Sequence, residues 1–172
     1  MLKFTIFATA AVLGLATPAL AADAPTDPQI AHIAYTAGNI DIAAGKQALA
    51  KTHNKAVRSF AQQMVRDHTA VNQKALALVK KLHVTAQDNP TSQSLTKGAA
   101  AERAKLAKLH GAAFDREYVN NEVAYHKTVN GALESTLIPS AKNGELKSLL
   151  ETGLTLFREH QAHAEQLAKA VK

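Results

Sequence analysis

Apolar residues recur every three or four positions along four long stretches of the chain. These stripes run from Ile30 to Ala48, from Val57 to Leu82, from Val119 to Leu133 and from Leu146 to Val171. Steps of three and four residues place such side chains on one face of an α-helix. The pattern therefore predicts four amphipathic helices, over about 28–52, 54–83, 112–137 and 145–171.

The connections between these helices differ in length. Pro139 and Asn143-Gly144 separate the third helix from the fourth, whereas the segment 84–111 between the second and third is long. It opens with the turn cluster 87–90 and contains a predicted short helix at Ala99–Leu109, ended by Gly111. The arrangement predicts an all-α, ferritin-like four-helix bundle whose 2–3 connection crosses over. An up-down-up-down bundle, in which this connection loops locally, is the alternative.

The first 21 residues have the features of a secretory signal peptide. Lys3 supplies the positive start, Phe4 to Leu15 the apolar core, and Ala19-Leu20-Ala21 the cleavage site. The apolar run is too short and too interrupted for a membrane anchor. We expect cleavage after Ala21, a short tail at 22–27, and one bundle domain over 28–172. This predicts a periplasmic or secreted protein with no transmembrane helix in the mature chain.

Composition narrows the chemistry further. The chain has no cysteine, which excludes disulfides, thiolate-bound zinc, iron–sulfur clusters and a cysteine nucleophile. Twenty Lys and Arg against fourteen Asp and Glu give a net charge of +6. The basic residues are scattered, which indicates solvated helix faces and disfavours nucleic-acid binding. Nucleophile-elbow, phosphate-loop and His-Glu-x-x-His motifs are absent from the sequence, which therefore favours a protein that is not an enzyme.

Ionisable residues occupy positions inside the apolar stripes, where burial is costly. Each predicted helix contributes at least one from its inner side: Asp41; His68, with Asp67 at the edge; Asp115, Glu122 and His126; and His160, with His163 one turn later. In the crossover topology, five of these residues lie roughly 10 to 14 residues, or about 15–21 Å, from one end of the bundle. The sequence therefore predicts that they can meet.

Imidazole and carboxylate ligands together suit zinc, iron, copper or manganese. The predicted metal site consists of Asp41, His68, Glu122, His126 and His160, with Asp67, Asp115, Tyr118 and His163 as supporting or alternative ligands. Di-iron carboxylate sites in bundles use Glu-x-x-His pairs. The sequence contains no such pair, which favours a mononuclear or vestigial site over a di-iron oxidase.

A buried polar network without metal is the alternative interpretation of the same residues. Asp41 could bond a tyrosine such as Tyr118 or Tyr125, and Asp115 could bond Tyr118. Glu122 and His126 could simply form a pair one turn apart on the helix face. The remaining histidines lie near predicted helix ends or outer faces and are expected at the surface: His32, His53, His83 and His110.

Several short motifs carry a family resemblance. They are Phe60-Ala61-x-x-Met64-Val65-x-Asp67-His68, Phe114-Asp115-x-x-Tyr118, His126 eight residues after that tyrosine, and Phe157-x-x-His160. Their combination resembles the exported bacterial family called domain of unknown function 4142, over about residues 28–170. The resemblance implies export and a fold of the ferritin-like superfamily. It singles out Asp67, His68, Asp115, Tyr118, His126 and His160 as motif positions and supplies no reaction. Asp41 departs from it, since the family more often has Glu there.

Two functions follow as expectations. The first is an exported bundle that binds a transition-metal ion in its core, for storage, buffering or protection against envelope stress. The second is a structural or interaction module of the cell envelope, in which the buried residues form only a hydrogen-bond network. Such a module would contact a partner protein, a polysaccharide or an anionic lipid surface, and members of the family are often described as outer-membrane or envelope proteins.

Overall fold

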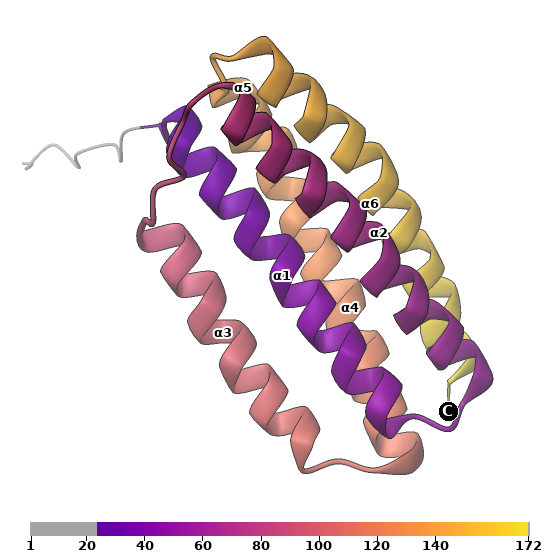
Figure 1. The fold of residues 1–172 in the computed structure, drawn as a ribbon. Helices are drawn as coiled ribbons and strands as arrows, with labels where there is room; N and C mark the ends of the chain where they lie inside the picture. The colour runs from indigo at the N-terminus through magenta and orange to yellow at the C-terminus, as the bar shows by residue number, and fades with distance from the viewer. Residues whose placement is uncertain (1–23, 172) are drawn as a thin grey trace, which may run out of the picture.

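The computed structural model of the protein describes residues 24–171, which fold into helices joined by short loops. Four long helices lie side by side (Figure 1): α1 (Asp27–Lys51), α2 (Lys55–Lys81), α4 (Gly111–Ala132) and α6 (Gly144–Ala170). A fifth, α3 (Pro90–Ala107), lies along the outside of α1, and short segments η1 (Leu133–Leu137) and α5 (Ile138–Ser140) lead from α4 toward α6. The predicted all-α bundle is confirmed.

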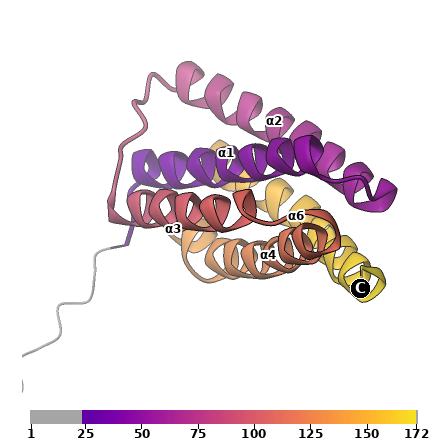
Figure 2. The same ribbon diagram turned by 90° about the horizontal axis from the view of Figure 1, so that it is seen from below.

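The connection between α2 and α4 crosses the length of the bundle. The chain leaves α2 at the end where α1 begins, runs back along α1 as α3, and enters α4 at the opposite end (Figures 1 and 2). As a result α2 and α4 begin at the same end at which α1 and α6 finish. The predicted crossover is confirmed, and it brings the inner positions of the four long helices to a common level.

Helix α3 is longer than predicted, and it begins nine residues earlier. The prediction of a helix at Ala99–Leu109 ended by Gly111 is wrong, because α3 spans Pro90–Ala107 and Gly111 instead opens α4 with a φ of 54°. Asn89 caps α3, its side chain accepting a hydrogen bond from the backbone N–H of Ser92 at 3.1 Å. Asn-Pro is thus an N-cap followed by proline in the first turn, not the turn that it resembles in the sequence.

The third predicted helix also differs at its end. Regular α4 finishes at Ala132, a π-helical turn follows over Leu133–Leu137, and Pro139 lies within the short helix Ile138–Ser140 instead of breaking the helix. Asn143 then caps α6 by accepting hydrogen bonds from two backbone N–H groups.

Asp27 in the first turn of α1 accepts hydrogen bonds from the backbone N–H groups of Lys142 and Asn143, each at 2.8 Å, and so fastens the loop between α5 and α6 to α1.

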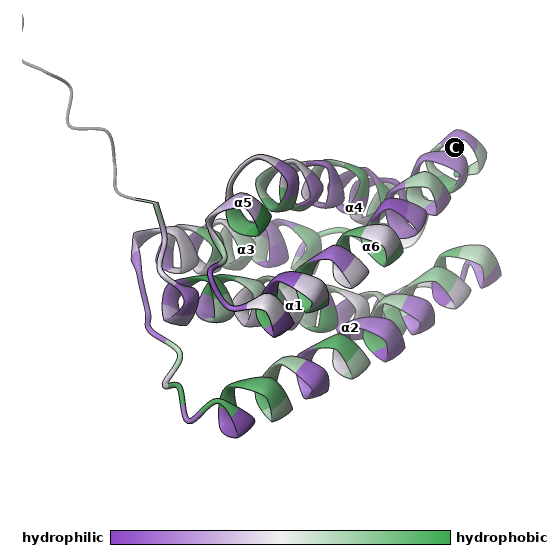
Figure 3. Ribbon diagram, turned by 90° about the horizontal axis from the view of Figure 1, so that it is seen from above, coloured by the Kyte–Doolittle hydropathy of each residue, from purple (hydrophilic) through white to green (hydrophobic). Residues whose placement is uncertain are grey.

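The core consists of two apolar layers. One surrounds Phe60, Phe114 and Tyr118 near the start of α2 and α4, and the other surrounds Leu137, Leu150 and neighbours near the opposite end. Coloured by hydropathy, each long helix carries both hydrophobic and hydrophilic ribbon, as amphipathic helices do (Figure 3). Between the two apolar layers lies a level of buried polar side chains.

The predicted signal peptide, residues 1–21, lies outside the described residues, as does the start of the tail at 22–27. Among the helices of residues 24–171, none combines the length and apolar character that crossing a bilayer requires.

Candidate metal centre

Each of the four long helices contributes to the polar level of the core. Asp41 comes from α1, His68 from α2, Glu122 and His126 from α4, and His160 from α6. Each of these residues is at most 2% exposed. Their helices turn these positions inward because the flanking apolar residues at three- and four-residue steps are buried against the other helices.

The five side chains form two overlapping groups. In the first group each histidine offers one ligand atom, and these three atoms lie within 4.8 Å of one another: His68, His126 and His160. The second group, with ligand atoms equally close, consists of Asp41, Glu122 and His126. His126 belongs to both groups, so the five residues make one continuous centre. The structure therefore brings together all five residues of the predicted primary site.

Hydrogen bonds orient two of the three imidazoles. The Nδ1 atom of His126 lies 3.0 Å from the backbone carbonyl of Glu122, one turn earlier in the same helix. The Nε2 atom of His160 lies 3.1 Å from Oδ2 of Asp67, which reaches over from α2. In each case a proton on the bonded nitrogen leaves the other nitrogen with a free lone pair: Nε2 of His126 and Nδ1 of His160.

His68 is held differently. Its ring stacks on Phe157, with ring centroids 4.7 Å apart and 13° between the planes. Its Nε2 lies 3.4 Å from Oδ2 of Asp41, and neither ring nitrogen makes a hydrogen bond within residues 24–171. The imidazole rings of His126 and His160 lie with their centroids 5.6 and 5.3 Å from that of His68. Packing against an aromatic ring therefore positions His68 without occupying its nitrogens.

Burial keeps the three histidines neutral. Desolvation lowers the pKa of His68 to about 4, although the charge of Asp67 acts in the opposite direction. Desolvation, with the neighbouring His68 adding to it, also lowers the pKa of His160 to about 4. The pKa of His126 is lowered mainly by burial as well. Neutral imidazole is the form that binds metal ions.

Burial acts on the two acids in the opposite sense. Desolvation raises the pKa of Asp41, while the nearby His126 partly offsets this. The pKa of Glu122 is raised well above its ordinary value, first by burial and then by the charge of Asp41. Two carboxyl groups facing each other in a dry core favour a shared proton or a cation that compensates their charge.

Several of the buried polar atoms lack a hydrogen-bond partner among residues 24–171. They are Oδ1 of Asp41, both ring nitrogens of His68, both carboxylate oxygens of Glu122, Nε2 of His126 and Nδ1 of His160. Buried polar groups are normally paired, and leaving one unpaired costs about 1–3 kcal/mol. Several such atoms on neighbouring buried side chains are unusual, and these nitrogen and oxygen donors match the preferences of transition-metal ions.

Of the predicted supporting residues, Asp67 contacts the centre and His163 does not. Asp67 contacts the centre through His160, and its other oxygen accepts a hydrogen bond from Arg66 at 2.9 Å. Burial raises the pKa of Asp67, but the hydrogen bonds from His160 and Arg66 outweigh it, so this pKa lies below its ordinary value. His163 is not part of the centre, because its Nδ1 lies 3.0 Å from the side chain of Gln63 and its ring packs edge-on against Phe60.

Asp115 and Tyr118 are buried in the apolar layer below the centre. Oδ1 of Asp115 and the hydroxyl of Tyr118 have no hydrogen-bond partner within the part of the chain described, so the expected bond between them is not formed. Burial, and then the charges of Glu122 and Asp41, raise the pKa of Tyr118 well above 10. The suggested bond between Tyr125 and Asp41 is also wrong, since Tyr125 donates to the backbone carbonyl of Ala37.

Two asparagines next to the centre were missed in the sequence analysis. Asn72 follows His68 by one turn and bonds the side chain of Asn39, and Asn130 follows His126 by one turn and bonds Gln161. A β-carbon on Gly38 would lie 2.3 Å from Oδ1 of Asn72, so α1 needs glycine there. The sequence contains a pattern that could have indicated them, because in α2 and again in α4 an asparagine follows the inward-facing histidine by four residues and therefore lies on the same helix face.

The outlying histidines fall largely as expected. His53, His83 and His110 are exposed, and none of them belongs to the centre. His32 is half-buried, with Nδ1 3.8 Å from a carboxylate oxygen of Asp88. These residues are useful controls because they carry the same chemistry outside the core.

Comparison with known families gives one result. A family model described as a domain of unknown function (DUF4142) matches residues 14–167. The chain belongs to this family. The match confirms the resemblance carried by the motifs around His68, Tyr118 and His160, and membership of the wider ferritin-like superfamily stays a prediction with which the helical bundle is compatible. Comparison with curated proteins and with solved structures found no match.

Proposed function

We propose that this DUF4142 protein is an exported helical bundle that binds one transition-metal ion between His68, His126 and His160. Asp41 and Glu122 stand beside this triad and supply further oxygen ligands or negative charge. Its role is storage, buffering or protection of the cell envelope against metal stress. The proposal assigns binding and no reaction.

One observation carries the proposal. Three buried imidazoles from three different helices have ligand atoms within 4.8 Å of one another, and each retains a nitrogen without a hydrogen-bond partner in residues 24–171. Nε2 of His126 and Nδ1 of His160 are the nitrogens left free by the bonds of these rings. The pair formed by Asp67 and His160 resembles the carboxylate–histidine arrangement that orients ligands and raises their basicity in metal sites.

A purely structural polar network is less consistent with these contacts. Hydrogen-bonded networks stabilise a core when every member is satisfied, and partial satisfaction costs more than an apolar replacement. Within the described chain both nitrogens of His68, Nε2 of His126 and Nδ1 of His160 have no hydrogen-bond partner. A bound cation would satisfy such donors and offset the raised proton affinity of the two acids.

The metal is not specified by the donor set alone. Three imidazoles with neighbouring carboxylates suit zinc, copper, iron or manganese, and the affinity order among divalent ions favours copper and zinc. The neutral state of the three histidines means that few protons need to leave the imidazoles when an ion binds.

Metal titration of the full-length gene product, purified without a histidine tag, tests the proposal. After treatment with EDTA, addition of zinc or copper is expected to yield about one tightly bound ion per chain by elemental analysis and to raise the melting temperature, as ligands specific to the folded state do. His68→Ala and His126→Ala should abolish both effects. His53→Ala and His83→Ala, which alter exposed histidines, should leave both unchanged.

The opposite results would overturn the proposal. Stoichiometric binding that survives in His68→Ala but disappears in His53→Ala would move the site to the surface. Failure of every tested metal to bind or to stabilise the wild-type protein would leave the structural network as the better account.

Export is tested by a separate experiment. N-terminal sequencing of the protein isolated from the periplasmic fraction is expected to begin at Ala22.

A further inference from the structure

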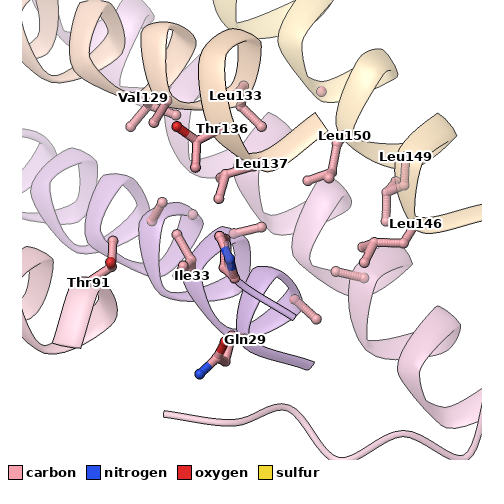
Figure 4. A pocket seen from close by; sticks show the side chains of 18 of the residues that line it. Gln29, Ile33, Thr91, Val129, Leu133, Thr136, Leu137, Leu146, Leu149 and Leu150 are labelled. Atoms are coloured by element: carbon pink, nitrogen blue, oxygen red, sulfur yellow. The ribbon is translucent and has the colours of Figure 1, made fainter. Parts of the chain in front are cut away.

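An apolar cavity lies in the bundle beyond the candidate metal centre. It has a volume of about 590 Å³, is partly enclosed, and is walled by the first half of α1, the second half of α2, the end of α4 with η1, and the first half of α6. Side chains from three of these segments, including Ile33, Leu137 and Leu150, surround it in Figure 4. Phe157 lines the end of the cavity that is nearest the candidate metal centre, and the same ring stacks on His68.

Small residues and diverging helices create this space. Ala34, Ala37 and Gly38 of α1, Ala75 of α2 and Gly153 of α6 all line it. Figures 2 and 3 show α2 diverging from α1 toward its C-terminal end, and Ala75, Leu78 and Val79 in this half of α2 line the cavity. Protein interiors are close-packed and rarely leave voids larger than a water molecule. A space of this size falls within the roughly 300–1,000 Å³ of pockets that hold one small molecule.

The walls define the chemistry of the occupant. Among the residues of 24–171 that line the cavity, none is Asp, Glu, Lys, Arg or His. Its polar side chains are three threonines, Gln29, Asn72 and Asn89. Asn72 already bonds Asn39, and Asn89 caps α3. Charged groups cannot be buried here without a partner, so phosphates, nucleotides and most metabolites do not fit.

The shape favours an extended chain over a compact molecule. Along α1 the lining runs from Gln29 to Gly38, and the helical rise makes this about 14 Å. Gln29 and Asn89 lie at the outer end, by the first turns of α1 and α3, and the aromatic ring of Phe157 lies at the inner end. The four long helices line most of the space, and the start of α3 and the residues before α1 line its partly open outer end, which suits a single slender chain that enters from that end.

We propose that this cavity binds the hydrocarbon chain of a free fatty acid, with the carboxyl group left in solvent at the outer end beside Gln29 and the exposed Thr91. Burial of methylene groups supplies the affinity, because the walls offer apolar contacts and almost no free hydrogen-bonding groups. The site is distinct from the metal centre, and its occupancy requires no metal.

Fluorescence titration of the full chain with cis-parinaric acid, in the presence of EDTA, tests the proposal. Saturable binding is expected, and unlabelled saturated fatty acids should displace the fluorescent one. Their affinity should rise about fourfold per added methylene until the chain fills the cavity, and then level off. Affinity that is independent of chain length would overturn the proposal.

Matched substitutions locate the site. Ala34→Leu and Ala75→Leu place larger side chains into the cavity on residues suited to a helix. Each should weaken binding at least tenfold, the double variant should abolish it, and the melting temperature of the double variant should not fall below that of the wild type. Ala50→Leu and Ala70→Leu make the same change at exposed positions of α1 and α2 and should leave binding unchanged.

Three further outcomes would overturn the proposal. Undiminished binding in the double variant would place the fatty acid elsewhere. Binding to phosphatidylcholine vesicles without binding of free fatty acid would indicate a membrane-contact surface. A dimer of the wild type that becomes a monomer in the double variant, by size-exclusion chromatography, would show that a second copy covers the cavity. Because EDTA is present throughout, failure of this test is independent of the metal proposal.

Discussion

The ring of Phe157 in α6 lies nearly parallel to the imidazole of His68 in α2, 4.7 Å away between centroids. Phe157 also lines the apolar cavity, so one side chain forms the boundary between that cavity and the candidate metal centre. His68 makes no hydrogen bond through either ring nitrogen within residues 24–171. The stacking contact with Phe157 and the carboxylate of Asp41, 3.4 Å from Nε2, therefore orient this imidazole.

Replacing Phe157 by leucine should weaken metal binding while keeping the side chain apolar. An aromatic pair contributes about 0.5–1.5 kcal/mol beyond its buried area, so the dissociation constant should rise roughly three- to tenfold. Isothermal titration with zinc measures this change. Phe114→Leu is the control, because it removes a buried phenylalanine that stacks on Tyr118 in the other apolar layer. An equal loss in both variants would mean that general loosening, and not ring orientation, explains the effect.

Asp67→Asn should reduce metal affinity about 10- to 100-fold with little effect on folding, because Asp67 orients His160 and increases its basicity. Competition with a chelating dye gives the affinity, and circular dichroism confirms the helical content. Glu134→Gln changes an exposed carboxylate that pairs with Arg158 and should leave the affinity unchanged. Unaltered affinity in Asp67→Asn would show that His160 is not a ligand.

Glu122→Gln should stabilise the metal-free protein at pH 8. The folded pKa of Glu122 is raised above its unfolded value, so the cost of burying its charge begins above about pH 4.5 and grows as pH rises toward the folded pKa. Glutamine removes this cost, and the free energy of unfolding in urea should increase at pH 8 by at least about 1 kcal/mol, the least that an uncompensated buried polar group costs, and by much less at pH 4.5. A loss of stability at pH 8 would mean that the carboxylate is compensated in the metal-free state.

His68→Gln should change the pH dependence in the opposite sense. Folded His68 has a pKa of about 4, whereas an unfolded histidine titrates near about 6.5, so the unfolded chain binds the extra proton between these values. Stability from this residue is present above about pH 6.5 and is lost as pH falls toward 4. The slope of unfolding free energy against pH should therefore be smaller in the variant, by up to about 1.4 kcal/mol per pH unit. Urea denaturation in EDTA at half-unit pH steps measures it, and an unchanged slope would contradict the lowered pKa.

Asp27→Ala should lower the free energy of unfolding by about 1–3 kcal/mol, because it removes a carboxylate that accepts hydrogen bonds from the backbone of Lys142 and Asn143. Thermal and urea denaturation measure the loss. Glu151→Ala removes an exposed acid from α6 and should change stability by no more than about 0.5 kcal/mol. Equal effects of the two substitutions would show that the clamp on the α5–α6 loop contributes nothing.

Much of the candidate metal centre was predictable because helical periodicity is strong in this chain. Asp41, His68, Glu122 and His160 each replace an apolar residue at a three- or four-residue step, and burial follows directly from that register. The length of segment 84–111 allowed either a crossover or a local loop, and the structure shows the crossover. The start of α3 was not predictable, since Asn89-Pro90 fits both a turn and a helix N-cap, and long-range packing against α1 selects the cap.

The sequence by itself determined the four long helices and their inner faces, because these depend on spacing within one chain segment. The crossover of the tertiary structure decided that the polar residues of the four helices lie at one level. Tertiary structure alone decided which nitrogen of His160 is free, since its partner Asp67 lies on another helix. It also decided that His163 turns to Gln63 and that Phe157 stacks on His68. Only the tertiary structure shows the cavity. Periodicity indicates which residues face inward, but the space left between helices depends on how far apart they pack and on how much of that space their side chains fill.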